Sequence, residues 1–296
     1  MRFTKAHGTG NDFVVLLDLE DRLHLPTGLV TALCDRRHGV GGDGVLRLGA
    51  PPAGADVFMD YRNADGTAVE MCGNGVRVTA KHLVDHGLVP ADADVVRVAT
   101  RAGIKPVHVE RNADGRLGRA TVDMGPPTLE PDRVPFVPAG DADDALQHEV
   151  VVDETPVRLT PVSMGNPHAV IEVETVDTAP VTTLGPRLEH HPRFPEKVNV
   201  GFAQVLDDDE IRLRVWERGV GETAACGTGA CAAVVALERR GSVGSHVAVH
   251  LPGGTLTIEV DPAGTVLLTG PAVEVAHGEL APAWLAGLAV REGGGP

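Results

Sequence analysis

Short stretches in which apolar and polar residues alternate dominate this sequence. In the clearest example, Ile211, Leu213 and Val215 alternate with Arg212 and Arg214. Successive side chains of a strand point to opposite faces, so this period predicts a half-buried β-strand. Similar runs, separated by turn signals, predict further strands at residues 13–17, 57–61, 95–99, 105–110, 120–124, 150–159, 169–173, 246–250, 255–260 and 265–269.

Only a few segments show the helical period. Residues 29–36, 75–86 and 229–240 place apolar side chains on one face at helical spacing. Residues 125–140 are rich in proline, which predicts a linker between two halves of the chain. The expected fold is therefore rich in strands, with a small number of helices.

The two best helices are preceded by the same local pattern. Each follows a cysteine, in CGNGVRVTAKHLVDHG (72–87) and in CGTGACAAVVALERRG (226–241). Each cysteine has glycine one, three and fifteen residues later, and the last glycine stands where a helix commonly ends. A Gly-Asn pair also precedes each cysteine by about 60 residues, at Asn11 and Asn166. This repeated layout predicts two related halves.

A cysteine at the start of a helix is placed for chemistry. The unpaired backbone N–H groups and the positive end of the helix dipole stabilise an anion there. We therefore expect the pKa of Cys72 and Cys226 to fall from about 8.5 toward the range of activated thiols. Two such thiols on opposite sides of one carbon could remove a proton from one face and return a proton to the other.

The composition excludes several other classes of protein. The 296 residues carry 41 Asp and Glu against 26 Lys and Arg, a formal charge of −15, which would repel nucleic acid and anionic membranes. No apolar stretch reaches the roughly 20 residues that a membrane span needs, and no signal peptide is apparent at the start. Four cysteines do not form a disulfide framework, which favours a reducing, cytoplasmic location.

Other residues that could form functional sites are better explained by ordinary structural roles. Cys34 and Cys231 open no helix behind glycines and are expected to be small buried residues. The histidines show no metal-binding spacing and there is no Cys-x-x-Cys pair, so we expect no metal site. Residues 39–44 match G-x-G-x-x-G, but no buried strand precedes them and no clear helix follows, which argues against a dinucleotide site.

Several ordered motifs carry a more specific resemblance. HGTGNDF (7–13), NADG (63–66), MCGNG (71–75), MGNPH (164–168), VNVGF (198–202) and ERGVGETAACGTGACAA (217–233) resemble the diaminopimelate epimerase family. The resemblance implies a cofactor-independent isomerase that interconverts LL- and meso-2,6-diaminopimelate, on the route to lysine and peptidoglycan. It also implies an α/β fold of the α+β type, with two pseudo-symmetric domains that each wrap a mostly antiparallel curved sheet around a central helix.

The resemblance also assigns roles to residues of this sequence. Cys72 and Cys226 would be the two bases, with His168 beside Cys72 and Glu217 beside Cys226 to tune their protonation. The backbone at Gly73, Asn74, Gly227 and Thr228 would hold the α-carboxylate of the reacting centre. The distal amino-acid end of the substrate would be bound by Asn11, Asn63, Asn166, Asn199 and Arg218, and Glu217 is also placed among the substrate-binding residues.

The expected domains are residues 1–125, to which residues 271–296 return, and residues 126–270, with the cleft between them. The partner is a small-molecule substrate, and a homodimer is one alternative for the oligomeric state. One departure from the family is Gly44, where many relatives have glutamine, so that a direct side-chain contact to substrate is lost there.

Three other functions remain open at this stage. A proline or hydroxyproline racemase shares the plan of two cysteines, but its site encloses an apolar ring, whereas this sequence offers several Asn and an Arg for a second charged group. A Cys–His hydrolase would use Cys72 and His168. A binding module without catalysis would leave the paired thiols unexplained.

Overall fold

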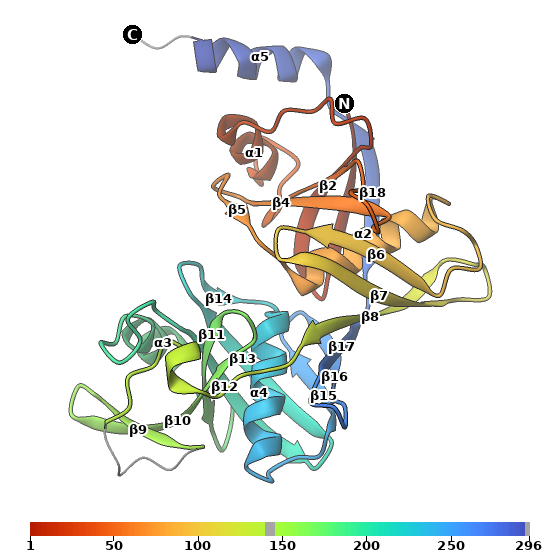
Figure 1. The fold of residues 1–296 in the computed structure, drawn as a ribbon. Coiled ribbons are helices and arrows are strands. Elements are labelled where there is room, and N and C mark those ends of the chain that lie inside the picture. The colour runs from red at the N-terminus through yellow and green to blue at the C-terminus, as the bar shows by residue number, and fades with distance from the viewer. Residues whose placement is uncertain (140–145, 294–296) are drawn as a thin grey trace. The chain divides into compact units, whose positions relative to one another are not determined.

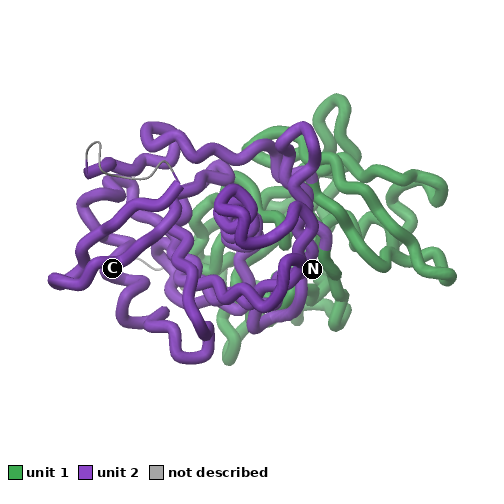
Figure 2. The backbone as a smooth tube through the Cα atoms, turned by 90° about the horizontal axis from the view of Figure 1, so that it is seen from below, with its two compact units in different colours: residues 1–122, 270–296 green, residues 123–269 purple. Residues whose placement is uncertain are grey.

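The computed structural model describes residues 1–139 and 146–293, and within them the chain forms two compact units. Unit 1 comprises residues 1–122 and 270–296, and unit 2 comprises residues 123–269 (Figure 2). Each unit is a mixed α/β structure with many strands and few helices (Figure 1).

The elements of unit 1 come from both ends of the chain. They are β1 (Arg2–Gly8), β2 (Asn11–Asp18), α1 (Thr27–Cys34), β3 (Gly44–Gly49), β4 (Val57–Asn63), β5 (Ala68–Val69), α2 (Gly73–Asp85), β6 (Val95–Thr100), β7 (Gly103–Arg111), β8 (Leu117–Gly125), β18 (Val273–Glu279) and α5 (Pro282–Gly293). Strand β18 pairs with β1, so the C-terminal segment completes the sheet that the N-terminus begins.

Unit 2 is continuous in sequence. Its elements are the 3₁₀ turn η1 (Pro131–Arg133), β9 (His148–Val152), β10 (Thr155–Ser163), β11 (Pro167–Glu172), α3 (Val181–Glu189), β12 (Asn199–Asp207), β13 (Glu210–Glu217), β14 (Gly221–Thr223), α4 (Gly227–Arg239), β15 (His246–Leu251), β16 (Gly254–Val260) and β17 (Val266–Gly270).

The two units repeat one topology. Neighbouring strands run β18-β1-β2-β3-β4-β6-β7-β8 in the first series and β9-β10-β11-β12-β13-β15-β16-β17 in the second. Two pairs in each series are parallel. They are β2/β3 and β4/β6 in the first series and, at corresponding positions, β11/β12 and β13/β15 in the second. The other pairs are antiparallel. The repeat that the sequence predicts from its cysteines is thus present in every strand pairing, and the mostly antiparallel α/β fold is confirmed.

Helices α2 and α4 are the central helices of their units. Helix α2 packs against β1, β6, β7 and β18, and α4 packs against β10, β11, β12 and β16. Along α4, residues 229–237 are all buried, since the strands cover the helix on several sides. A helix that is apolar all round is stable only when it is enclosed in this way.

The strand β13 shows the predicted alternation. Ile211, Leu213 and Val215 are at most 1% exposed, whereas Arg212 and Arg214 form ion pairs with Asp177 and Glu222. All three predicted helices form, and α2 and α4 begin two residues earlier than predicted. The glycine after each, Gly87 and Gly241, has a positive φ of 63° and 74°, as a helix-terminating glycine requires.

Two helices, α3 and α5, were not predicted from the sequence. Helix α3 contains Pro186, which normally indicates a helix end. The tertiary structure favours the helix because it packs closely on Trp216, where a Cβ at Gly185 would lie 2.7 Å from the Trp216 side chain. Helix α5 lies beside α1, and the indole N–H of Trp284 donates to the carbonyl oxygen of His38 at 3.1 Å.

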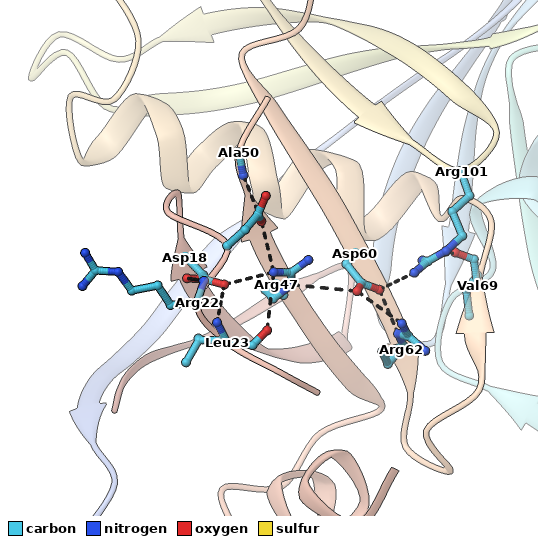
Figure 3. Close-up of polar contacts among 10 residues, drawn as sticks. Asp18, Arg22, Leu23, Arg47, Ala50, Asp60, Arg62, Val69 and Arg101 are labelled. Carbon is cyan, nitrogen blue, oxygen red and sulfur yellow. Dashed lines mark hydrogen bonds and ion pairs between the residues drawn. The ribbon is translucent and has the colours of Figure 1, made fainter. Parts of the chain in front are cut away.

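A half-buried ionic network joins neighbouring strands of unit 1 (Figure 3). Arg47 on β3 lies between Asp18 on β2, with Nη1 3.0 Å from Oδ2, and Asp60 on β4, with Nε 3.9 Å from Oδ2. Asp60 in turn accepts from Arg62 at 2.8 Å and from Arg101 at 2.7 Å. Buried charges need such partners, so the network fixes the strands that lead to the predicted site.

Candidate active site

Both predicted thiols occupy the same position in their units. Cys72 is the residue before the first residue of α2, with φ −145° and ψ 118°, and Cys226 precedes α4 with φ −118° and ψ 111°. Their backbone is extended while the following residues are helical, so each side chain stands beside the first free N–H groups of a helix. The local environment that the sequence predicts for the thiols is therefore present twice.

In unit 1, Cys72 belongs to a cluster of amides. The Cys72 thiol donates to Asn11 Oδ1 at 3.8 Å, and Asn74 Nδ2 donates to the same oxygen at 3.2 Å. The Asn11 Nδ2 group donates to Asp43 Oδ2 at 2.8 Å. The loop after β4 adjoins this cluster, because the N–H of Ala64 donates to the Asp43 carbonyl oxygen at 3.0 Å. Asn63 ends β4 and donates to Thr67 Oγ1 at 3.2 Å.

In unit 2, Cys226 ends a chain of polar contacts. Its Sγ lies 3.6 Å from Thr228 Oγ1, which accepts from Asn166 Nδ2 at 3.4 Å. Asn166 Oδ1 lies 3.1 Å from His168 Nε2. Four residues that the sequence singles out thus meet beside the start of α4.

A second group of predicted residues lies at the ends of β12 and β13. Asn199 is buried, and its Oδ1 accepts from the backbone N–H of Arg218 at 2.9 Å while its Nδ2 donates to the Pro167 carbonyl oxygen at 2.9 Å. The Arg218 guanidinium donates through Nη1 to the Glu196 carbonyl oxygen at 2.8 Å. Glu217 accepts a hydrogen bond from the hydroxyl of Thr223.

The electrostatics of Cys226 differ from the sequence prediction. Burial raises the pKa of this thiol well above its usual value, and the charge of Glu217 raises it further. Hydrogen bonds from Thr228 and the Gly229 N–H oppose this shift but do not overcome it. The predicted low pKa is therefore wrong for Cys226, because burial and a neighbouring carboxylate outweigh the hydrogen bonds at the start of the helix, and the thiol is protonated at neutral pH.

His168 is neutral for a similar reason. Its side chain is 1% exposed, and burial, together with the charge of Arg218, lowers its pKa to about 3. Its Nδ1 has no hydrogen-bond partner among the residues that the structure describes. An uncharged imidazole can position a polar neighbour or exchange a proton, but it does not supply a fixed positive charge.

Sequence analysis missed Arg77, which lies on the buried side of α2. The side chain is 0% exposed, and Nη2 donates to Asn74 Oδ1 at 2.8 Å and to Thr9 Oγ1 at 2.9 Å. Its Nη1 lies 3.4 Å from the Gly73 carbonyl oxygen. The sequence feature that could have indicated a role for Arg77 is an arginine on an otherwise apolar helix face. Arg77 fixes the first turn of α2, on which the position of Cys72 depends.

Gly44 has a steric explanation in the structure. A Cβ at this position would lie 2.4 Å from the Arg62 carbonyl oxygen and 2.5 Å from the Tyr61 ring. The ring of Tyr61 packs edge-on against Phe13, with centroids 5.5 Å apart. A larger side chain at position 44 would therefore need both strands and the ring to shift.

The sequence was compared with protein families and with curated proteins. The model of the family described as diaminopimelate epimerase matches residues 3–130 and 160–275. The chain is 50% identical over 283 residues to the diaminopimelate epimerase of Azotobacter vinelandii, covering 95% of this chain and 99% of that protein. It is 49% identical over 283 residues to the diaminopimelate epimerase of Pseudomonas aeruginosa, with the same coverage of 95% and 99%.

Solved structures with low sequence identity share the fold. A probable proline racemase from Agrobacterium radiobacter has a TM-score of 0.68 at 18% identity, covering 95% of this chain and 93% of that chain. A hydroxyproline epimerase from Agrobacterium vitis has a TM-score of 0.68 at 17% identity, covering 94% and 91%. In the part of the chain that the structure describes, no helix is long and apolar enough to cross a membrane.

Proposed function

This chain belongs to the diaminopimelate epimerase family, and from that membership we propose which residues carry its reaction. It is an isomerase that interconverts the LL and meso forms of 2,6-diaminopimelate, a small-molecule substrate. Cys72 and Cys226 are the two bases that exchange the proton of one α-carbon. The mechanism requires that both thiols reach the same carbon from opposite faces.

One observation carries this proposal. Two cysteines hold the same N-terminal position on the central helices of two units with one repeated topology. A single nucleophile would need only one such helix. An epimerase needs two equivalent proton carriers, because a proton leaves one face of the carbon and another arrives at the opposite face.

The two thiols must differ in protonation before each turnover. Burial and Glu217 raise the pKa of Cys226, which supports its role as the protonated partner at rest. The partner thiol, as thiolate, takes the α-hydrogen, and Cys226 then donates its proton to the carbanion. The protonation states of the two cysteines are exchanged at the end of the step, and the reverse direction uses the opposite roles.

The helix ends stabilise the charge that develops on the substrate. The N–H groups at Gly73 and Asn74 and at Gly227 and Thr228 are the proposed donors to the α-carboxylate. Fixed dipoles of this kind lower the free energy of an enolate-like carbanion without reorganisation during the reaction. These groups need no cofactor for the proton transfers.

The distal amino-acid end of the substrate is the second part of the proposal. Asn11, Asn63, Asn166 and Arg218 would bind it, with the guanidinium pairing with the distal carboxylate. The Asn199 side chain accepts from the backbone N–H of Arg218 and donates to the Pro167 carbonyl oxygen, which supports a role of Asn199 in positioning Arg218. His168 would keep Asn166 and Thr228 aligned. The position of His168 beside Cys72, which the resemblance implies, stays a prediction.

Deuterium exchange tests the function and its main alternative together. The protein is incubated in deuterated water with LL-diaminopimelate or with L-proline, and the α-position is followed by NMR. We expect deuterium in diaminopimelate only. Exchange into proline would favour the racemase, and ligand binding with no exchange into either compound would favour a binding module.

Replacement of each thiol tests the residue assignment. Cys72→Ala and Cys226→Ala should each abolish epimerisation, whereas Cys34→Ala, at a buried cysteine outside the site, should retain activity. A Cys–His hydrolase would need only one cysteine, so substantial activity in Cys226→Ala would contradict the two-base proposal. A cytoplasmic location and a homodimer also remain proposals, and light scattering of the purified protein measures the second.

A further inference from the structure

A cluster of histidines and one carboxylate lies at the end of α2 opposite Cys72. His82 and His86 are four residues apart on the last turn and the end of this helix. Glu274 and His277 come from β18, the strand that the C-terminal segment adds to unit 1. All four residues therefore belong to one unit, although 192 positions separate His82 from Glu274 in the sequence.

Three of these side chains bring possible metal-ligand atoms close together. His82 Nδ1 lies 2.7 Å from Glu274 Oε1, and His86 Nε2 lies 3.1 Å from Glu274 Oε2. One ring nitrogen of each histidine and one carboxylate oxygen of Glu274 all lie within 4.8 Å of one another. In a tetrahedral zinc site with bonds of roughly 2.0 Å, neighbouring ligand atoms are about 3.3 Å apart. The three ligand atoms, all within 4.8 Å of one another, therefore need only small side-chain movements to reach that separation.

A third histidine, His277, lies beside the carboxylate. His277 Nε2 lies 3.5 Å from Glu274 Oε2, and its other ring nitrogen, Nδ1, lies 3.0 Å from the Thr4 hydroxyl. A hydrogen bond on one imidazole nitrogen orients the ring and leaves the other nitrogen for a metal. Thr4 is buried and faces His277 in the register of β1 and β18, so this orientation is fixed by the sheet.

The partial burial of the cluster and the negative charge around it also favour the binding of a cation. The side chains of His82 and Glu274 are 6% and 9% exposed, whereas those of His86 and His277 are 39% and 58% exposed, so the cluster is closed on one side and accessible on the other. The C-terminal end of a helix carries a partial negative charge, which favours a cation at this place. The net charge of −15 adds a general attraction for cations.

From this geometry we infer that His82, His86 and Glu274 form a binding site for a divalent transition-metal ion of the zinc type, with the more exposed His277 beside the carboxylate. Imidazole and carboxylate are ligands that Zn²⁺ accepts readily. The ion would join the end of the helix that begins at Cys72 to strand β18. Sequence analysis predicted no metal site because no metal-binding spacing was recognised among the histidines. His82 and His86, four residues apart on a helix, do have such a spacing, and their carboxylate partner is distant in sequence.

Zinc binding is measured directly in a chain without the active-site thiols, because thiolates also bind zinc. The Cys72→Ala/Cys226→Ala chain is first treated with a chelator. One portion is titrated with ZnCl₂ by isothermal titration calorimetry, and another is dialysed against ZnCl₂ and its bound zinc is measured. We expect one Zn²⁺ per chain and a rise in melting temperature. Co²⁺ in place of Zn²⁺ should give the visible absorption of a tetrahedral site without a thiolate charge-transfer band.

Two variants and a matched control locate the site. Glu274→Gln keeps the volume of the side chain and replaces one acceptor oxygen by an NH₂ donor, and His86→Ala removes a partly exposed ring, so both should fold. Each should weaken zinc binding at least tenfold. His246→Ala removes an exposed histidine that also lies near a glutamate, Glu259 at 3.8 Å, and should leave binding unchanged.

Failure of the metal site is distinguishable from failure of the proposed function, since none of these measurements uses epimerase activity. An absence of zinc from the dialysed chain would overturn the inference. Equal binding by the His86→Ala, Glu274→Gln and parent chains would also overturn it.

Discussion

The side chain of Asn199 accepts a hydrogen bond from the backbone N–H of Arg218, with Oδ1 2.9 Å from the nitrogen. Asn199 begins β12, and Arg218 follows the last residue of β13. The Asn199 amide donates in addition to the Pro167 carbonyl oxygen at the start of β11. One buried amide thus joins three strand ends at the place where the proposed distal-carboxylate ligand leaves the sheet.

Replacement of Asn199 by alanine should therefore affect both stability and substrate binding. The change leaves the backbone N–H of Arg218 and the buried carbonyl oxygen of Pro167 without this partner, which costs about 2 kcal/mol of unfolding free energy. We expect a higher KM for diaminopimelate, because Arg218 is no longer held in place. Urea denaturation and steady-state kinetics measure the two effects. The matched control is Asn112→Ala, an exposed asparagine in a turn of unit 1, and an equal loss in both variants would contradict the positioning role.

The negative charge of Glu217 should control the reactivity of Cys226. Only the thiolate reacts with iodoacetamide, so a raised pKa makes alkylation slow at pH 8. Glu217→Gln removes the charge and lowers the pKa, which should increase the alkylation rate of Cys226 several-fold. The rate is measured by peptide mass spectrometry in a Cys72→Ala background. Glu222→Gln, at an exposed glutamate paired with Arg214, is the control and should leave the rate unchanged.

The buried histidine should make unit 2 sensitive to acid. The pKa of His168 is about 3 in the folded chain, against an ordinary value of 6.5 in the unfolded one. Between these values the unfolded chain binds more protons, so the contribution to stability is present above pH 6.5 and is lost as the pH falls toward 3. Linkage predicts a loss of about 2 kcal/mol between about pH 7 and about pH 5.

His168→Gln should remove that part of the pH dependence. Denaturant unfolding of unit 2 is followed at several pH values through the fluorescence of Trp216, which lies on β13. His246→Ala, which replaces an exposed ring of the same unit, is the control and should keep the slope of the parent protein. An unchanged slope in His168→Gln would show that other groups cause the acid sensitivity.

A methyl group at Gly229 should disturb Cys226 without unfolding the protein. A Cβ there would lie 3.3 Å from Cys226 Sγ and 3.2 Å from the Val215 side chain. Both contacts are tight, so the thiol must move by a few tenths of an ångström. We expect kcat for Gly229→Ala to fall about tenfold, because proton transfer depends steeply on the position of the donor atom.

A control for this effect is available on the same unit. Gly244→Ala places a Cβ 3.6 Å from the Asp208 carbonyl oxygen, which is an ordinary contact. Its kcat should match that of the parent protein, and both variants should keep the parent circular dichroism spectrum. Full activity in Gly229→Ala would mean that the thiol position tolerates the displacement.

Local sequence patterns determined much of this protein. The alternation from Ile211 to Val215 specified a strand, and the pattern after each cysteine predicted the starts of α2 and α4 to within two residues. These features depend on residues close together in the chain, so period and turn chemistry are sufficient to predict them. The repeated pattern also indicated two halves, and the matching strand pairings of the two units agree with it.

Long-range packing determined the features that local sequence patterns did not predict. Helix α3 forms despite Pro186 because Gly185 packs on Trp216, which lies 31 positions further along the sequence. The pKa of Cys226 is set by burial and by Glu217, which the helix start alone does not reveal. The cluster of His82, His86 and Glu274 exists only because β18 returns to β1. Burial and distant charges depend on the whole fold, and no local pattern encodes them.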